Sequence, residues 1–192
     1  MTYEDVYMPF TTHQTSLNGV LLLEPKVFSD DRGVFYESFN HRDLTNALGT
    51  TLTFVQDNHS QSKKNVLRGL HYQIKQTQGK LVKVTRGEVF DVCVNLQRGH
   101  PQFGQWAGIR LNAEDKRQVW IPPGFAHGFL ILTDVAEVMY KTTDYYAPEH
   151  ERSLLWNDPA IGIQWPLIGQ PILSKKDASA PPLAQAELFA LV

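Results

Sequence analysis

Two histidines lie in surroundings that suit catalytic or metal-binding residues. His71 is part of the run Val66–Gln73, beside Gly69, and His127 follows the turn Pro122-Pro123-Gly124. Both segments are short and rich in β-forming residues, and a small β-barrel would direct the two imidazoles into one cavity. Such a pair could bind a transition metal, transfer protons, or fill space in a core.

The ligand set around the two histidines is incomplete for a metal site. The run Pro122-x-Gly124-x-x-His127 resembles the second signature of the cupin jelly roll, in which a Pro-Gly turn delivers a histidine to the next strand. Metal-binding cupins have a His-x-His pair in their first signature, but this chain has His71-x-Gln73, and Ile131 stands where an asparagine is usual. Because a transition-metal site needs several nitrogen or oxygen ligands around one ion, we expect no metal site.

A more specific pattern extends over nearly the whole chain, from about Gly19 to Leu183. Six separated runs resemble the dTDP-4-dehydrorhamnose 3,5-epimerase family, in the order of that family and close to its spacing. The runs are Asp31-Arg32-Gly33-x-Phe35-x-Glu37, Gln56-Asp57-Asn58, Val66-Leu67-Arg68-Gly69-Leu70-His71-x-Gln73, Gly124-Phe125-Ala126-His127-Gly128-Phe129, Tyr140-Lys141-x-Thr143-x-Tyr145-Tyr146 and Leu173-Ser174-x-Lys176-Asp177. A joint match of this kind is far more specific than any one run.

The resemblance implies a role for each site residue. His71 would be the general base, Asp177 the carboxylate that orients it, and Tyr140 the acid on the opposite face of the sugar. Lys80, a further catalytic group, and His127 resemble the family's polar residues near the C4 carbonyl of the substrate. The other substrate-binding residues that the family implies are Arg32, Glu37, Gln56, Asp57, Asn58, Arg68, Tyr146, Glu151 and Lys176, with Tyr146 stacking on thymine and Asp91 matching a position behind these groups.

The implied reaction is the epimerisation of dTDP-4-dehydro-6-deoxy-D-glucose at C3 and C5, which gives dTDP-4-dehydro-L-rhamnose. A C–H bond next to a ketone is broken only if the developing enolate is stabilised, and Lys80 and His127 are suited to that task. Inversion also needs a base and an acid on opposite walls, as His71 and Tyr140 would be. Arginine side chains suit binding of the diphosphate, and an aromatic ring suits stacking on the nucleobase. Since side chains would supply every step of the reaction, no cofactor is expected.

Three other functions compete with this one. A relative that inverts only one carbon of a dTDP-4-keto-deoxysugar would use the same base, so the sequence barely separates the two. A non-catalytic cupin that binds a nucleotide or a sugar is a function of another class. It remains open because His71, taken alone, would more often be a structural histidine than a base. A metal-dependent cupin oxygenase is disfavoured by Gln73 and Ile131.

Length, charge and hydropathy restrict the remaining possibilities. A chain of 192 residues suits one domain, which would span residues 1–192 with a C-terminal capping segment from about residue 173. A net charge of -2 argues against nucleic-acid binding, and runs such as Val20–Leu23 are too short to cross a membrane. The N-terminus lacks the features of a signal peptide, so we expect a cytoplasmic protein. The resemblance implies a homodimer in which exchanged N-terminal strands, including Arg32, complete the partner's site.

Short β-rich runs alternate with turns, which is typical of an all-β barrel or sandwich and agrees with a cupin-type jelly roll. One short helix is expected at His41–Leu48, with Asn40 as its N-cap and Gly49 as its end, and another at Leu183–Leu191. The predicted strands are Val20–Phe28, Val34–Phe39, Leu52–Asn58, Val66–Gln73, Lys80–Arg86, Val89–Leu96, Trp106–Leu111, Gln118–Ile121, His127–Leu132 and Val135–Thr143.

Alternation along two of these strands raises structural questions. In one strand Asp91, Cys93 and Asn95 share a face, which is either exposed to solvent or directed into a polar barrel interior. In another strand, strict alternation places Arg68 and His71 on opposite faces. Both can reach one ligand only if the strand is irregular between them, so a bulge is predicted at Gly69.

Overall fold

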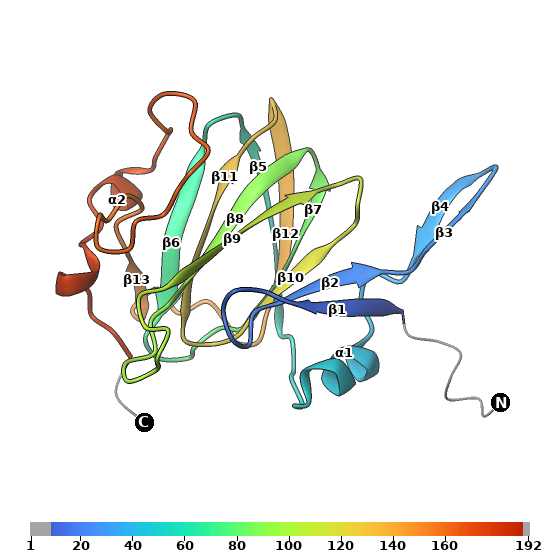
Figure 1. Cartoon of the computed structure of the whole chain (residues 1–192), viewed down its shortest axis with the longest axis horizontal. Helices are drawn as coiled ribbons and strands as arrows, with labels where there is room; N and C mark the ends of the chain where they lie inside the picture. Colours follow the sequence, from blue (N-terminus) through green and yellow to red (C-terminus); the bar gives the residue numbers. More distant parts are fainter. Residues whose placement is uncertain (1–8, 190–192) are drawn as a thin grey trace.

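The computed structural model describes residues 9–189 and consists of two facing antiparallel sheets with a separate hairpin (Figure 1). Valines of both sheets, such as Val82 and Val89, pack together in the interior. The predicted all-β jelly roll is therefore confirmed. The larger sheet has the order β1 (Phe10–Gln14), β2 (Leu21–Pro25), β10 (Gln118–Ile121), β7 (Lys80–Arg86), β12 (Val135–Thr142) and β5 (Gln56–Lys63). The smaller has the order β13 (Glu151–Ser153), β6 (Leu67–Gln73), β11 (Phe125–Ile131), β8 (Glu88–Asn95) and β9 (Trp106–Asn112).

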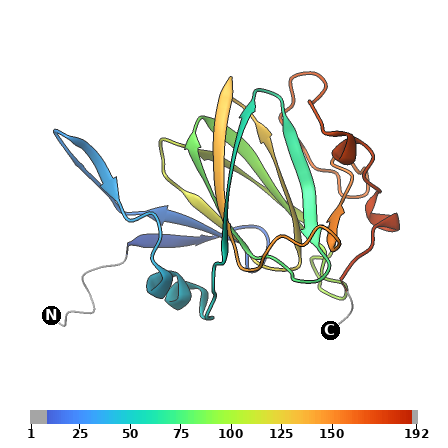
Figure 2. The ribbon, with the colours of Figure 1, turned by 180° about the vertical axis from the view of Figure 1, so that it is seen from behind.

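The two faces of β8 have different surroundings, and both are covered. Cys93 packs in the core between the sheets, and Asp91 is buried on the same face. On the other face Val92 and Val94 pack under the C-terminal part of the chain, which lies against the smaller sheet (Figure 2). Phe90 packs edge-on against Trp165 there. The polar face of β8 therefore points into the barrel, as one of the two interpretations of the sequence required.

The predicted bulge at Gly69 is present. His127 of β11 pairs with His71 of β6, but Phe129 pairs with Arg68, so two residues of β6 face one residue of β11. Gly69 has a φ of 116°, which favours glycine. A Cβ atom at Gly69 would lie 2.6 Å from the Cα atom of Gly128, so the close approach of β6 and β11 also requires a glycine here.

Helix α1 (His41–Leu48) has the predicted bounds and caps. The Asn40 side chain accepts a hydrogen bond from the backbone N–H of Asp43, and Gly49 ends the helix in a left-handed conformation. Leu44 packs with Trp120 and other residues on the outer face of the larger sheet. This helix covers that sheet on the side away from the barrel interior.

Several element predictions were wrong in extent. The predicted strand Val20–Phe28 is divided into β2 and β3 (Val27–Asp30), and β3 pairs with β4 (Gly33–Tyr36) in a hairpin that projects from the barrel (Figure 1). The strand predicted at Leu52–Asn58 is β5, which begins only at Gln56, because residues 52–54 pack beside α1 instead. Strands β1 and β13 were not predicted.

The C-terminal helix was also misplaced. The predicted helix Leu183–Leu191 is reduced to one 3-10 turn, Leu183–Gln185, and residues 186–189 are not helical; residues 190 and 191 lie outside the described part. Leu188 and Phe189 instead pack on the outer face of the smaller sheet. A short helix that was not predicted, α2 (Lys175–Ala178), lies beside β6.

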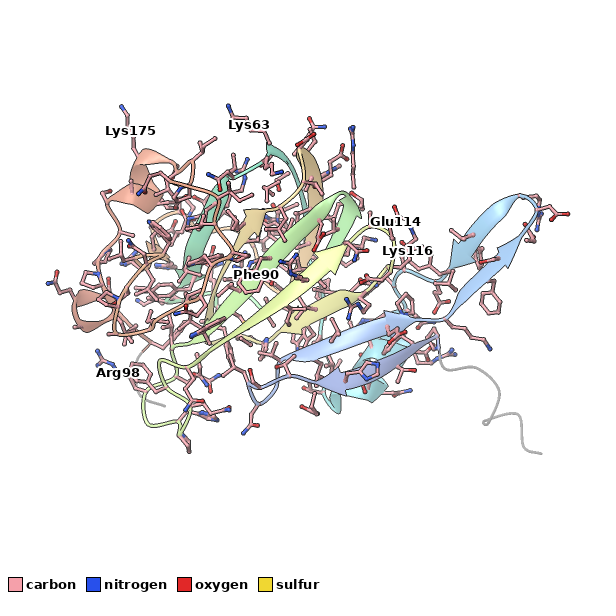
Figure 3. The ribbon with its side chains drawn as sticks, turned by 45° about the horizontal axis from the view of Figure 1, so that its top comes forward. Lys63, Phe90, Arg98, Glu114, Lys116 and Lys175 are labelled. Carbon is pink, nitrogen blue, oxygen red and sulfur yellow. The ribbon has the colours of Figure 1, made fainter. Side chains whose placement is uncertain are left out.

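The surface carries charged side chains around the barrel. Lys63, Glu114 and Lys175 are exposed and point away from the ribbon (Figure 3).

Within residues 9–189, no helix is long and apolar enough to cross a membrane.

Candidate active site

A cavity of about 610 Å³ opens between the two sheets. Strand β6 supplies residues to one wall, and β5 and β12 supply residues to the facing wall. Most of the predicted site residues line this cavity: Gln56, Asn58, Arg68, His71, Lys80, His127, Tyr140, Tyr146, Glu151, Lys176 and Asp177. Residues that are far apart in the sequence are thus brought to one place by the facing sheets.

His71 and Asp177 form a short hydrogen bond at one wall. Nε2 of His71 donates to Oδ1 of Asp177 over 2.6 Å. Asp177 is held in turn by helix α2, because its backbone N–H donates to the side chain of the N-cap residue Ser174. Burial alone would raise the pKa of Asp177, but the hydrogen bond and the charge of His71 outweigh it and lower the pKa. An acceptor at Nε2 fixes the tautomer, so Nδ1 carries the lone pair that can accept a proton.

Tyr140 lies on the wall opposite His71. It belongs to β12 of the larger sheet, whereas His71 belongs to β6 of the smaller sheet. The Tyr140 ring meets the ring of His127 edge-on, with centroids 6.4 Å apart. Burial raises the pKa of Tyr140, although the nearby charge of Arg68 partly offsets the increase. The phenol therefore keeps its proton at neutral pH and can donate it.

A lysine and a histidine lie at the buried end of the cavity. Nε2 of His127 donates to Oδ2 of Asp91 over 2.8 Å, and both side chains are buried. Lys80 is buried beside them, and its Nζ atom lies 3.5 Å from the backbone oxygen of His71. Burial lowers the pKa of Lys80 to about 8, although the charges of Asp91 and Glu151 oppose the shift. The ammonium group of Lys80 can donate a hydrogen bond to an oxygen that gains negative charge, and His127 can do so from Nδ1 when its ring carries both protons.

The open end of the cavity contains a connected polar network. The Tyr146 hydroxyl donates to Oε2 of Glu151 over 2.8 Å, and Nζ of Lys176 lies 2.7 Å from Oε1 of the same carboxylate. Burial would raise the pKa of Glu151, but the hydrogen bonds from Lys176 and Tyr146 lower it. The Tyr146 backbone N–H donates to Gln56, whose amide donates to Asn58. Tyr146 is thus held from both sheets, by its backbone N–H from β5 and by its hydroxyl from β13.

The bulge at Gly69 lets Arg68 reach the same cavity as His71. The Arg68 Nε atom donates to the hydroxyl of Ser62 on β5 over 3.0 Å, which connects the two sheets. Without the extra residue between them, Arg68 and His71 would point to opposite faces of β6.

Three predicted residues do not line the cavity of this chain. Asp57 lies between Gln56 and Asn58 on β5, so alternation turns it to the outer face, where it pairs with Lys141 at 3.0 Å. Arg32 is in the turn of the β3–β4 hairpin, where its side chain is 90% exposed and pairs with Asp30. Glu37 follows this hairpin, and one of its carboxylate oxygens is buried without a partner among the described residues.

Some cavity residues were not predicted. Ser60 follows Asn58 at the next inward position of β5, so the alternation of that strand would have identified it. Ser174 caps α2, and its spacing of three residues from Asp177 is the usual signal of such a cap. Gln73 also lines the cavity. Within the described residues, no cluster of three or more His, Cys, Asp or Glu side chains is arranged to hold a metal ion.

Comparison with known proteins decides the family. Residues 14–185 match the sequence model of the family described as dTDP-4-dehydrorhamnose 3,5-epimerase. The chain belongs to this family. A dTDP-4-dehydrorhamnose 3,5-epimerase of Pseudomonas aeruginosa is 61% identical over 174 residues, which are 91% of this chain and 96% of the relative. The family suggested by the six sequence runs is therefore confirmed, and with it an isomerase.

Solved structures of epimerases have the same fold. The crystal structure of dTDP-6-deoxy-D-glucose-3,5-epimerase from Legionella pneumophila Philadelphia 1, in complex with dTDP-4-keto-L-rhamnose, has a TM-score of 0.93 at 50% identity and covers 95% of this chain and 99% of its own. A 3'-monoepimerase from Streptomyces bikiniensis, in complex with dTDP-quinovose, has a TM-score of 0.85 at 37% identity, covering 90% of this chain and 87% of its own. The fold is thus shared by epimerases described as acting at two positions and at one.

Proposed function

We propose that this protein inverts C3 and C5 of dTDP-4-dehydro-6-deoxy-D-glucose and so produces dTDP-4-dehydro-L-rhamnose. The observation that carries the proposal is the His71–Asp177 pair on one sheet with Tyr140 on the facing sheet. Inversion of a carbon requires a proton acceptor and a proton donor on opposite sides of the sugar. The same pair serves both carbons, because both are adjacent to the C4 ketone.

His71 is the general base of the proposed reaction. Its Nδ1 atom takes the proton from the carbon, and the electron pair of the C–H bond moves into the enolate. The carboxylate of Asp177, bonded to Nε2, stabilises the imidazolium that results. Asp177 also keeps the ring in place, since it is fixed by the cap of α2.

Lys80 and His127 stabilise the enolate oxygen. Both side chains are buried, and a hydrogen bond to a developing charge is strong in such surroundings. Asp91 accepts from Nε2 of His127 and so leaves Nδ1 of that ring for the substrate when the ring is protonated. Tyr140 then gives its proton to the opposite face of the carbon. Solvent returns the proton to Tyr140 and removes the one on His71, and the chemistry needs no cofactor.

The open end of the cavity binds the nucleotide in this proposal. The half-exposed ring of Tyr146 is a platform for thymine, since aromatic rings stack on nucleobases. Arg68 and Lys176 supply positive charge for the diphosphate. Gln56, Asn58 and Glu151 orient these groups through the polar network described above.

A second copy of the chain completes the site in this proposal. The β3–β4 hairpin projects from the barrel and exposes Phe35 and Val34, which are 70% and 57% accessible. Exposed apolar side chains on a projecting element are typical of an interaction surface. A homodimer would bury them and carry Arg32 and Glu37 toward the partner's cavity, which they do not reach in their own chain.

The test is the configuration of the product. Purified protein is incubated with dTDP-4-dehydro-6-deoxy-D-glucose, and the proton–proton couplings of the sugar are read by NMR. Inversion at both C3 and C5 supports the proposal, and inversion at one carbon supports the single-site alternative, which the Streptomyces bikiniensis monoepimerase represents. Binding without turnover would identify a non-catalytic nucleotide-binding cupin.

A further inference from the structure

Gln73 is a buried amide that the mechanism above does not use. It ends β6 two residues after His71, so the two side chains share a face of the strand. Metal-binding cupins carry a ligand histidine at this position. The residue is only 4% exposed, and a buried amide is costly unless its donors and its acceptor are paired. The partners of Gln73 therefore indicate what it does.

All three partners of the Gln73 amide are backbone groups of two loops. Nε2 donates to the backbone oxygen of Gln76 over 2.7 Å and to that of Tyr145 over 3.2 Å. Oε1 accepts from the backbone N–H of Ala147 over 2.9 Å. The amide thus binds the backbone of the residues immediately before and immediately after Tyr146.

Tyr146 is held by two further hydrogen bonds, the first of which runs from its backbone N–H to Oε1 of Gln56 on β5. Its side chain is about half exposed, and its hydroxyl is held by Glu151. Glu151 is itself the cross-strand partner of Gln73 in the pairing of β13 with β6. The backbone groups on either side of Tyr146 bind Gln73, and the Tyr146 hydroxyl binds Glu151, so both connect the platform to the end of β6, the strand that carries His71.

We propose that Gln73 is a positioning residue that fixes the Tyr146 platform relative to the general base and thereby sets the affinity for the nucleotide half of the substrate. The inference rests on the proposed function only in taking Tyr146 as the surface on which thymine stacks.

The test compares two glutamines that make the same kind of clamp. Gln102 donates to the backbone oxygen of Ser16 and accepts from the backbone N–H of Asn18, so it brackets Leu17 as Gln73 brackets Tyr146, but outside the cavity. Gln73→Met and Gln102→Met are measured for the affinity of dTDP and of inorganic pyrophosphate by calorimetry, and for kcat and KM. Thermal unfolding checks that each variant is folded.

Gln73→Met should weaken dTDP binding by roughly 5- to 150-fold, the range found when a stacking aromatic residue is removed. It should leave pyrophosphate binding unchanged and raise KM far more than it lowers kcat. Gln102→Met should bind both probes like the wild type. Unchanged dTDP affinity in folded Gln73→Met, or an equal loss for pyrophosphate, would overturn the proposal.

A double-mutant cycle separates positioning from general damage. In a Tyr146→Ala background, Gln73→Met should cause no further loss of dTDP affinity, because the platform is already absent. Additive losses would contradict the proposal. If Gln73→Met does not fold, Gln73→Glu keeps the acceptor for Ala147 but places an oxygen against two carbonyls, and the same results are expected. If neither variant folds, Gln73 is needed for the stability of the barrel, and the proposed positioning role is refuted. Wild-type turnover tests the proposed function separately.

Discussion

Nε2 of His71 and Oδ1 of Asp177 lie 2.6 Å apart although 106 positions separate the residues in the sequence. Asp177 reaches this place because the chain after residue 154 returns over the outer face of the smaller sheet and then forms helix α2 beside β6. The carboxylate is buried, and the histidine is partly open to the cavity. This arrangement suits a base whose tautomer is fixed from behind and whose other nitrogen faces the substrate.

Replacement of Asp177 by Asn should reduce turnover by about 10²- to 10⁴-fold. The amide can donate a hydrogen bond to Nε2 and so favour the tautomer with its proton on Nδ1, the nitrogen that has to accept a proton from the substrate. It should also change the acid unfolding curve. The folded pKa of Asp177 lies below its ordinary value, so the pair adds stability above pH 3.8 that is lost as the pH falls through the lower folded pKa. Urea titrations from pH 2 to pH 7 measure this. An unchanged acid limb in Asp177→Asn would contradict the account.

The alkaline limb of the pH–rate profile should report Lys80. Its pKa is lowered to about 8 by burial, so the cation that stabilises the enolate is lost as the pH rises through that value. We expect kcat/KM to fall above about pH 8. Lys80→Met should be slower by about 10²- to 10³-fold and should lose this limb. A limb that persists unchanged in Lys80→Met would show that another group titrates there, and Tyr140 is unsuitable because its pKa is raised above 10.0.

Gly69→Ala should be strongly destabilising. The new Cβ atom would lie 2.6 Å from Cα of Gly128 and 2.7 Å from the backbone oxygen of His127, and the φ of 116° is already unfavourable for alanine. Together these should cost about 3 to 5 kcal/mol of unfolding free energy. Gly33→Ala is the matched control, since Gly33 has a φ of 125° and nothing within 4 Å, and it should cost only about 1 to 2 kcal/mol. Equal losses in urea titrations would mean that the bulge tolerates a side chain.

Phe35→Asp should abolish the proposed dimer. Burial of this exposed ring would favour association, whereas a carboxylate at the same place would have to be desolvated. Light scattering after size exclusion should show a dimer for the wild type and a monomer for the variant, with lower activity. Phe103→Asp is the control, because Phe103 is an exposed aromatic residue outside the hairpin. A monomeric wild type with full activity would refute the exchanged site.

The parts of the fold that could be predicted have their signals in local sequence. Helix α1 has a capping Asn40 and a terminating Gly49, and strands β7 and β10 are short runs rich in β-branched and apolar residues. All three have the predicted bounds. The bulge at Gly69 followed from the requirement that Arg68 and His71 share one ligand.

The parts that were missed depend on tertiary surroundings. Strand β5 contains no apolar residue, because its inward face borders the polar cavity, so hydropathy placed the strand too early, at Leu52. The C-terminal residues through Phe189 suit a helix locally, but packing on the smaller sheet keeps those after Gln185 non-helical. The adjacent residues Gln56 and Asp57 were both assigned to the ligand, whereas pleating turns them to opposite sides.

The central claim, that His71 removes protons next to the ketone and Tyr140 returns them, is tested most directly by incubation with the dTDP-4-keto sugar in deuterium oxide, followed by NMR. The wild type should place deuterium at both C3 and C5. Tyr140→Phe should lose turnover by about 10²- to 10³-fold yet still exchange a proton that the base can reach. His71→Asn should remain folded and show no exchange at either carbon. Exchange at both carbons without His71 would contradict the account.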